Sequence, residues 1–177
     1  MIITQTSLDG CFVIEPRVFK DERGYFFESF NKEQFEDTLG RSIEFVQDNQ
    51  SHSFRGVLRG LHFQEGEYAQ AKLVRVVKGK VLDVAVDLRV DSPTFAQHFS
   101  IELDDENQKQ LFVPRGFAHG FVVLSEEAIF TYKCDNYYHK PSESGIIYND
   151  PTLNIDWKME ASQLIISEKD LALPKLQ

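Results

Sequence analysis

The stretch KVLDVAVDL at residues 80–88 decides the fold class. Its apolar side chains recur with a period of two, and two carboxylates, Asp83 and Asp87, fall on the opposite face. Such alternation predicts a β-strand with one buried face and one exposed face. The alternating aliphatic positions are Leu82, Val84, Val86 and Leu88.

More strands are predicted on both sides of this stretch. The apolar run at 72–77 precedes it, and the intervening Lys78-Gly79-Lys80 has the composition of a hairpin turn. Further apolar or aromatic runs follow at short intervals, separated by proline, glycine or polar clusters. These runs occupy residues 98–103, 111–113, 119–124 and 128–134.

Helical signals are few. Asn31 can cap a helix in which Gln34 has capping-box spacing, Phe35 and Leu39 share a face, and Gly40 ends the helix. A weaker helical segment is expected within 160–171. Because no long helix separates successive strands, the pattern excludes βαβ alternation and predicts an antiparallel sandwich or barrel.

Length and composition predict one domain over residues 1–177, with 42% hydrophobic residues to build its core. The sequence has no apolar run of about 18 residues, so we expect no membrane span. It also begins without a basic region or a sustained apolar run, so we expect a cytoplasmic protein. Cys11 and Cys134 are far apart and are expected to be free buried thiols.

The net charge of −9 disfavours binding to nucleic acid or to an anionic membrane. Residues 55–80 are an exception, since they hold six basic and two acidic residues, a local charge of +4. A basic segment in an acidic protein points to a small anionic ligand. The six basic residues are Arg55, Arg59, Lys72, Arg75, Lys78 and Lys80.

In VLRGLHFQ at residues 57–64, Arg59 and His62 interrupt an apolar run. A regular strand would place them on opposite faces, but a bulge at Gly60 would turn both toward one cavity. The alternative is a hydrogen-bonded core histidine beside a surface arginine.

PRGFAHGF at 114–121 has the P-x-G-x-x-H spacing that resembles the second motif of cupin barrels. The first cupin motif would supply two histidines, whereas this chain has His62-Phe63-Gln64. Two histidines and an amide are a poor set of ligands for a transition metal, so we expect a metal-free cupin. His119 could also be a structural turn residue. In FTYKC at 130–134, Tyr132 shares a face with Phe130, and its alternative role is packing.

Several motifs in one order resemble the dTDP-4-dehydrorhamnose 3,5-epimerase family. The resemblance runs from residue 21 to residue 170. It implies an all-β fold, a cupin-type double-stranded β-helix (jelly-roll) barrel with a few short peripheral helices, acting as a homodimer on a dTDP-sugar without metal or cofactor. The matching motifs are DERGYFFESF at 21–30, RGLHFQ at 59–64, QAKLVR at 70–75, PRGFAHGF at 114–121, YKCDNYY at 132–138, NDP at 149–151 and SEKD at 167–170.

The reaction implied by the resemblance inverts C3 and C5 of dTDP-4-dehydro-6-deoxy-D-glucose, giving dTDP-4-dehydro-L-rhamnose for dTDP-L-rhamnose biosynthesis. By resemblance, His62 is the base, Asp170 orients it, Tyr132 is the acid and Lys72 stabilises the enolate oxygen. An imidazole titrates near neutrality, which suits general-base catalysis. Lys72 shares a face with Val74 and Val76, consistent with an inward direction; otherwise it would be a solvated strand charge.

The resemblance also implies a set of substrate-binding residues, in which arginine suits bidentate recognition of phosphate. These are Arg23, Glu28, Gln47, Asn49, Arg59, His119, Tyr138, Glu143 and Lys169. Tyr138 would stack on the thymine ring.

Three other functions remain open. A mono-epimerase acting at C3 or C5 only is the nearest one. A non-catalytic sugar-binding cupin would have no need of an acid and a base together. A metal-dependent cupin oxygenase or isomerase is disfavoured by the missing second histidine.

Overall fold

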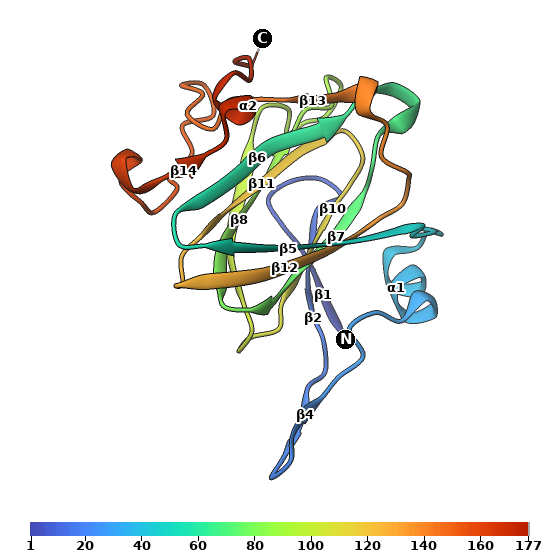
Figure 1. The fold of residues 1–177 in the computed structure, drawn as a ribbon. Helices are drawn as coiled ribbons and strands as arrows, with labels where there is room; N and C mark the ends of the chain where they lie inside the picture. Colours follow the sequence, from blue (N-terminus) through green and yellow to red (C-terminus); the bar gives the residue numbers. More distant parts are fainter. Residues whose placement is uncertain (177) are drawn as a thin grey trace.

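Two antiparallel sheets face each other in the computed structural model, which describes residues 1–176 (Figure 1). The first sheet has the strand order β1-β2-β10-β7-β12-β5 and the second has the order β13-β6-β11-β8-β9, with β14 added parallel to β6. The predicted all-β, antiparallel architecture is therefore confirmed. The strands are β1 (Ile2–Gln5), β2 (Phe12–Glu15), β3 (Phe19–Asp21), β4 (Gly24–Phe26), β5 (Gln47–Phe54), β6 (Val57–Gln64), β7 (Lys72–Lys78), β8 (Lys80–Asp87), β9 (His98–Asp104), β10 (Gln110–Val113), β11 (Phe117–Val123), β12 (Glu127–Cys134), β13 (Glu143–Gly145) and β14 (Ile165–Ile166).

The helices are short and peripheral. The predicted N-terminal helix is confirmed as α1 (Lys32–Leu39), capped by the Asn31 side chain and ended by Gly40 in the left-handed conformation. The predicted helical segment at 160–171 is confirmed only in part, because strand β14 interrupts it. The remaining helices are the 3₁₀ turns η1 (Gly66–Tyr68), η2 (Lys140–Ser142) and η3 (Ala161–Gln163), and α2 (Glu168–Leu171). Within residues 1–176, none of these helices has the length and apolarity needed to cross a membrane.

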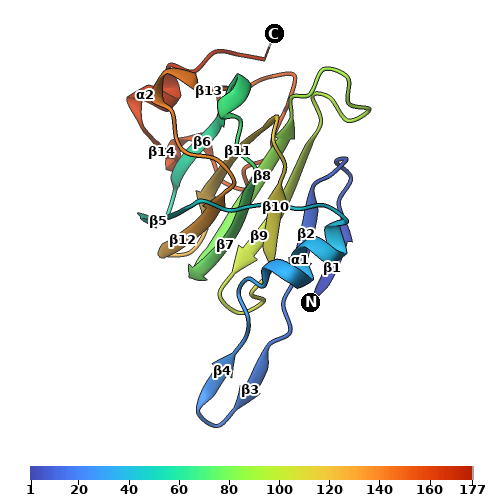
Figure 2. The same ribbon diagram turned by 90° about the vertical axis from the view of Figure 1, so that its right-hand side faces the viewer.

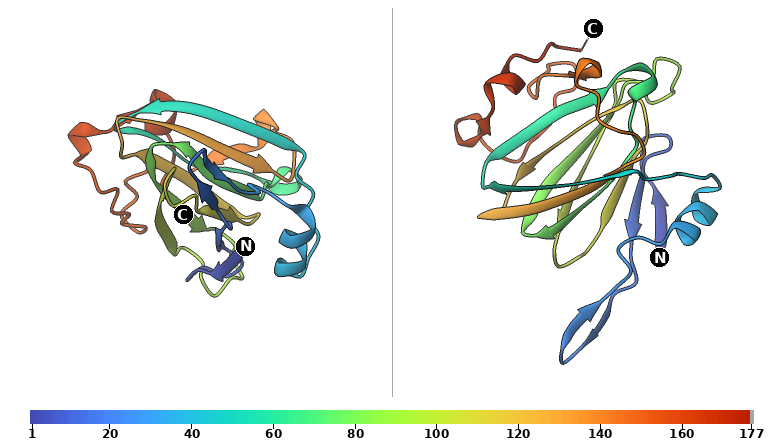
Figure 3. Two further views of the ribbon diagram at one scale, coloured as in Figure 1. Left: turned by 90° about the horizontal axis from the view of Figure 1, so that it is seen from below. Right: turned by 45° about the vertical axis from the view of Figure 1, so that its right-hand side comes forward.

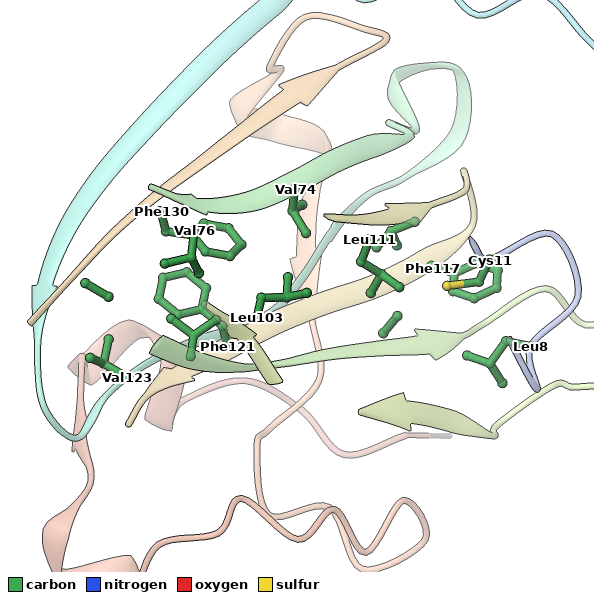
Figure 4. Packing of buried hydrophobic residues seen from close by; sticks show 14 residues of the cluster. Leu8, Cys11, Val74, Val76, Leu103, Leu111, Phe117, Phe121, Val123 and Phe130 are labelled. Atoms are coloured by element: carbon green, nitrogen blue, oxygen red, sulfur yellow. The ribbon is translucent and has the colours of Figure 1, made fainter. Parts of the chain in front are cut away.

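The main core fills the space between the two sheets (Figure 4). Phe121 of β11 stacks on Phe130 of β12 with ring centroids 4.3 Å apart, which joins the sheets at the centre. Cys11 and Cys134 are buried and free, as predicted. Burial raises the pKa of the Cys11 thiol to about 12, so this thiol stays protonated and inert.

The prediction that strand β8 has one exposed face is wrong, because all of residues 81–87 are buried. Leu82, Val84 and Val86 pack against apolar side chains of residues 146–176, here called the C-terminal segment. This segment covers the outer face of the second sheet. Asp83 and Asp87 therefore point to the barrel interior, not to solvent. In Figure 2 this segment, which carries β14 and α2 and is coloured orange and red, lies beside β6.

The predicted hairpin at Lys78-Gly79-Lys80 is also wrong. Strand β7 pairs with β10 and β12, whereas β8 pairs with β9 and β11, so the turn passes from one sheet to the other. Gly79 has a φ of +81°, and a Cβ there would lie 2.0 Å from the Glu127 carbonyl oxygen. The positive φ and this close approach both require glycine at the corner, whether the chain turns back as a hairpin or crosses to the other sheet.

Strands β3 and β4 form a separate two-stranded hairpin. It projects away from both sheets (Figure 3). Phe19, Tyr25 and Phe26 on it are exposed, Phe26 by 68%. We call residues 19–26 the arm.

Candidate active site

A cavity of about 630 Å³ opens between the two sheets. Strands β5, β7 and β12 of the first sheet form one wall, and β6 and β11 of the second sheet form the other, with the C-terminal segment along the edge. It continues into a smaller hollow of about 270 Å³ beside Tyr138 and Glu143, and the two share Asn49, His62, Lys72 and Tyr132.

A bulge at Gly60 places Arg59 and His62 on the same wall, as predicted. His62 pairs with His119 and Arg59 pairs with Phe121, so β6 uses three steps where β11 uses two. The extra residue brings both side chains to the cavity face. A Cβ on Gly60 would lie 2.6 Å from the Gly120 Cα, so the strands can approach this closely only with glycine there.

The C-terminal helix α2 brings Asp170 to His62. Asp170 Oδ1 lies 2.7 Å from His62 Nε2, and its Oδ2 accepts the backbone N–H of Gly60. Ser167 caps α2 by accepting the Asp170 N–H. The Asp170 side chain is 6% exposed and the His62 ring 29% exposed. The carboxylate can thus hold the ring in one tautomer while the ring remains open to the cavity.

Tyr132 and Lys72 come from the opposite sheet. The Lys72 ammonium lies 5.9 Å from the centroid of the Tyr132 ring. Burial raises the pKa of Tyr132, and Glu143 raises it further while Arg59 opposes the shift. The phenol is therefore protonated at neutral pH and can donate its proton. Burial lowers the pKa of Lys72, and the carboxylates of Asp83 and Glu143 oppose this shift.

His119 of β11 lies directly opposite His62 in the strand register. Its Nε2 is 2.9 Å from Oδ1 of Asp83 on β8, so His119, which lines the same wall as His62, also has a carboxylate partner behind it. Asp83 was not predicted as a site residue, because the alternation along 80–88 places it on the face opposite the apolar side chains. Its signal was the carboxylate itself, within an otherwise apolar strand.

The other predicted binding residues at the cavity form its rim. Glu143 accepts the Tyr138 hydroxyl at 2.8 Å and pairs with the Lys169 ammonium at 2.6 Å. Gln47 bonds Asn49 through its side chain, at 3.0 Å. Arg59, also in the cavity lining, donates to Ser53 at 3.1 Å.

Arg23 and Glu28 lie away from the cavity of their own chain. Arg23 is in the turn of the arm and pairs with Asp21, while Glu28 follows β4 and accepts from the Asn31 amide. The structure therefore gathers every predicted site residue except these two into the cavity or the adjoining hollow.

The predicted basic cluster does not form one patch. Of its six residues, Arg59 and Lys72 line the cavity, whereas Lys78 pairs with Glu127 on the surface. Within residues 1–176, no three His, Cys, Asp or Glu side chains converge as a metal site would require. The ring Nε2 atoms of His62 and His119 already face carboxylates.

Comparisons with known proteins agree with this geometry. A sequence model described as dTDP-4-dehydrorhamnose 3,5-epimerase matches residues 5–177. The Salmonella typhimurium dTDP-4-dehydrorhamnose 3,5-epimerase is 54% identical over 177 residues, covering 99% of this chain and 96% of that protein.

Two solved structures share the fold. The dTDP-4-dehydrorhamnose 3,5-epimerase of Elizabethkingia anophelis is 55% identical with a TM-score of 0.95, covering 99% of this chain and 96% of that one. The dTDP-6-deoxy-D-glucose-3,5-epimerase of Legionella pneumophila, solved in complex with dTDP-4-keto-L-rhamnose, is 48% identical with a TM-score of 0.92, covering 99% and 98%. These similarities confirm the predicted cupin-type jelly roll, and the chain belongs to the dTDP-4-dehydrorhamnose 3,5-epimerase family.

Proposed function

We propose that this chain converts dTDP-4-dehydro-6-deoxy-D-glucose into dTDP-4-dehydro-L-rhamnose by inverting C3 and C5, the epimerisation step of dTDP-L-rhamnose biosynthesis. The family assignment supports this function. The observation that carries the mechanism is the origin of His62 and Tyr132 from opposite sheets around one cavity. Inversion needs a base and an acid on opposite faces of the sugar ring.

His62 removes the proton in this mechanism. C3 and C5 both flank the C4 ketone, so loss of either proton leaves an enolate with its charge on the C4 oxygen. Asp170 holds His62 through Nε2 and stabilises the imidazolium that forms. The Lys72 ammonium stabilises the enolate oxygen, a contribution on the order of 3 to 4 kcal/mol by analogy with single oxyanion-hole donors. Tyr132, whose raised pKa keeps it protonated, returns a proton to the other face.

The binding residues around the cavity fit a nucleotide sugar. Arg59 supplies a guanidinium for the diphosphate, and His119 contacts the sugar or phosphate. Tyr138, held at the rim by Glu143, presents an exposed ring on which a base can stack. Gln47, Asn49 and Lys169 supply the remaining polar contacts. These groups belong to one domain spanning residues 1–177, within which His62 and Asp170 meet across 108 residues.

Arg23 and Glu28 enter the proposal through a homodimer. The projecting arm has exposed aromatic rings that a second copy would cover. If the arm packs on the partner, Arg23 and Glu28 can reach the partner's cavity instead of their own. This arrangement accounts for their distance from the site in a single chain.

Complementation tests the arm. Arg23→Ala and His62→Asn chains, each inactive alone, are unfolded, mixed and refolded together. Random pairing makes half the dimers mixed, each with one intact site, so about a quarter of wild-type activity should return. If activity stays at the level of the separate variants although the dimers form, Arg23 does not act across the interface. Sedimentation as a monomer would contradict the homodimer directly.

The function itself is tested in deuterated water with dTDP-4-dehydro-6-deoxyglucose as substrate. We expect one solvent deuterium at C3 and one at C5 of a product inverted at both carbons, read by NMR. Inversion with deuterium at one carbon only would identify a mono-epimerase. An unchanged substrate would refute the proposed function.

A further inference from the structure

Asp83 is a buried carboxylate that the mechanism above does not use. It lies on β8 in the barrel interior, 0% exposed, and the one hydrogen bond of its side chain within residues 1–176 is the 2.9 Å contact with His119. Its other oxygen, Oδ2, is buried without a partner. A buried acceptor without a donor destabilises a fold, and a buried charge more so.

Asp87, four residues along the same strand and face, is the natural comparison. It is also fully buried, but it accepts hydrogen bonds from Arg89, Ser92 and Thr94 and so fastens the loop after β8. Those bonds lower the pKa of Asp87 to about 2 against the opposing effect of burial. Asp87 thus has a structural role, whereas the sole partner of Asp83 is a side chain of the cavity wall.

The His119–Asp83 pair repeats the arrangement of His62–Asp170. In both pairs the carboxylate lies at Nε2, and in both the ring lines the cavity. No residue of the described chain hydrogen-bonds to Nδ1 of His119. When Nε2 donates to the carboxylate, Nδ1 is the ring nitrogen available to a ligand.

We propose that Asp83 is a positioning residue for His119: it keeps a proton on Nε2 and orients the ring so that Nδ1 serves the nucleotide sugar. The inference rests on the proposed function, since it concerns how His119 meets that substrate. It adds a residue outside the cavity lining to the machinery of the site.

The substitution Asp83→Asn separates this role from a structural one. An amide has nearly the same shape but can donate to Nε2, which leaves the ring proton on Nδ1 and presents the wrong tautomer to the substrate. It also removes a buried charge whose Oδ2 has no hydrogen-bond partner within residues 1–176. We therefore expect the Tm of Asp83→Asn to equal or exceed that of the wild type. Asp87→Asn, the matched control on the same strand, should lower Tm because its three side-chain donors lose a charged acceptor.

Nitrogen-15 NMR of histidine-labelled protein reads the tautomer without substrate. In the wild type, the Nε2 of His119 should show the chemical shift of a protonated nitrogen. In Asp83→Asn the Nε2 signal should move toward the non-protonated range and Nδ1 toward the protonated range. An Nε2 without a proton in the wild type would overturn the proposal, whether or not the proposed reaction is correct.

A double-mutant cycle supplies the kinetic test. Asp83→Asn should lower kcat/KM by about 10- to 100-fold, the usual loss when an orienting partner is removed. Because Asp83 acts through His119, Asp83→Asn combined with His119→Gln should be no worse than His119→Gln alone. Fully additive losses, or wild-type kcat/KM in Asp83→Asn, would refute the positioning role. A wild-type protein without turnover would refute the proposed function, and the NMR result would then decide the role of Asp83.

Discussion

Removing the charge of Asp170 should slow both epimerisations to the same extent. Asp170 lies 2.7 Å from His62 and keeps its backbone position through the Ser167 cap, so Asp170→Asn removes the charge and leaves the local fold in place. Its amide can also donate to Nε2 and move the ring proton to Nδ1, which adds to the loss. His62 becomes an imidazolium in each proton abstraction. The variant therefore loses the attraction that stabilises this cation at C3 and at C5 alike.

The size of the loss follows from the geometry of the pair. Opposite unit charges about 4 Å apart attract by about 4 kcal/mol at an effective dielectric constant of about 20. This energy corresponds to about three powers of ten in rate. The His62 ring is 29% exposed, so water screens part of the attraction. We expect kcat/KM to fall by about 10²- to 10³-fold.

The assay measures product formation and deuterium uptake at both carbons for the wild type, Asp170→Asn and Glu168→Gln. Glu168 is an exposed carboxylate on the same helix, so its substitution controls for the loss of one charge in α2 and should leave kcat/KM within twofold. A loss under tenfold in Asp170→Asn, or a loss confined to one carbon, would show that this carboxylate does not support the base.

The other predictions concern the acid, the backbone, the cation and metals. His62→Asn should abolish deuterium uptake at both carbons, whereas Tyr132→Phe should retain exchange at one or both and lose inversion; inversion at the wild-type rate in Tyr132→Phe would rule out Tyr132 as the acid. Gly60→Ala should lower activity and Tm, because backbone strain reduces the free energy of unfolding by about 1 to 3 kcal/mol and the added Cβ clashes with β11; an unchanged Tm by calorimetry would contradict the bulge argument. Because burial lowers the pKa of Lys72 below the ordinary lysine value of 10.5, kcat/KM should fall as rising pH deprotonates this side chain, at a pH below 10.5. Lys72→Arg should move this fall to higher pH, and a fall that stays at the same pH would assign it to another group. Activity should survive exhaustive chelation by EDTA, and loss that a divalent ion restores would refute the metal-free mechanism.

Local sequence signals predicted most of the secondary-structure elements and the bulge in β6. Period-two runs located most of the strands, Asn31 and Gly40 located α1, and Gly60 within an apolar run located the bulge. These features depend on near neighbours in the chain, so a single sequence carries them. The family motifs then selected the side chains that the cavity gathers.

Only the tertiary structure decided how the faces and distant segments meet. Periodicity divides a strand into two faces but does not say what covers each one. Asp83 was therefore assigned to solvent. In the structure the barrel encloses the face that carries Asp83, and the C-terminal segment covers the other face of the strand. A turn that contains glycine likewise has the same composition whether the next strand pairs with the preceding strand or enters the other sheet. At Gly79 the chain enters the other sheet. The order of motifs along a chain also records no distances, so it did not reveal that Arg23 and Glu28 lie outside the cavity of their own chain. Contacts between residues far apart in sequence result from burying both sheets at once, a property of the whole chain that no local segment contains.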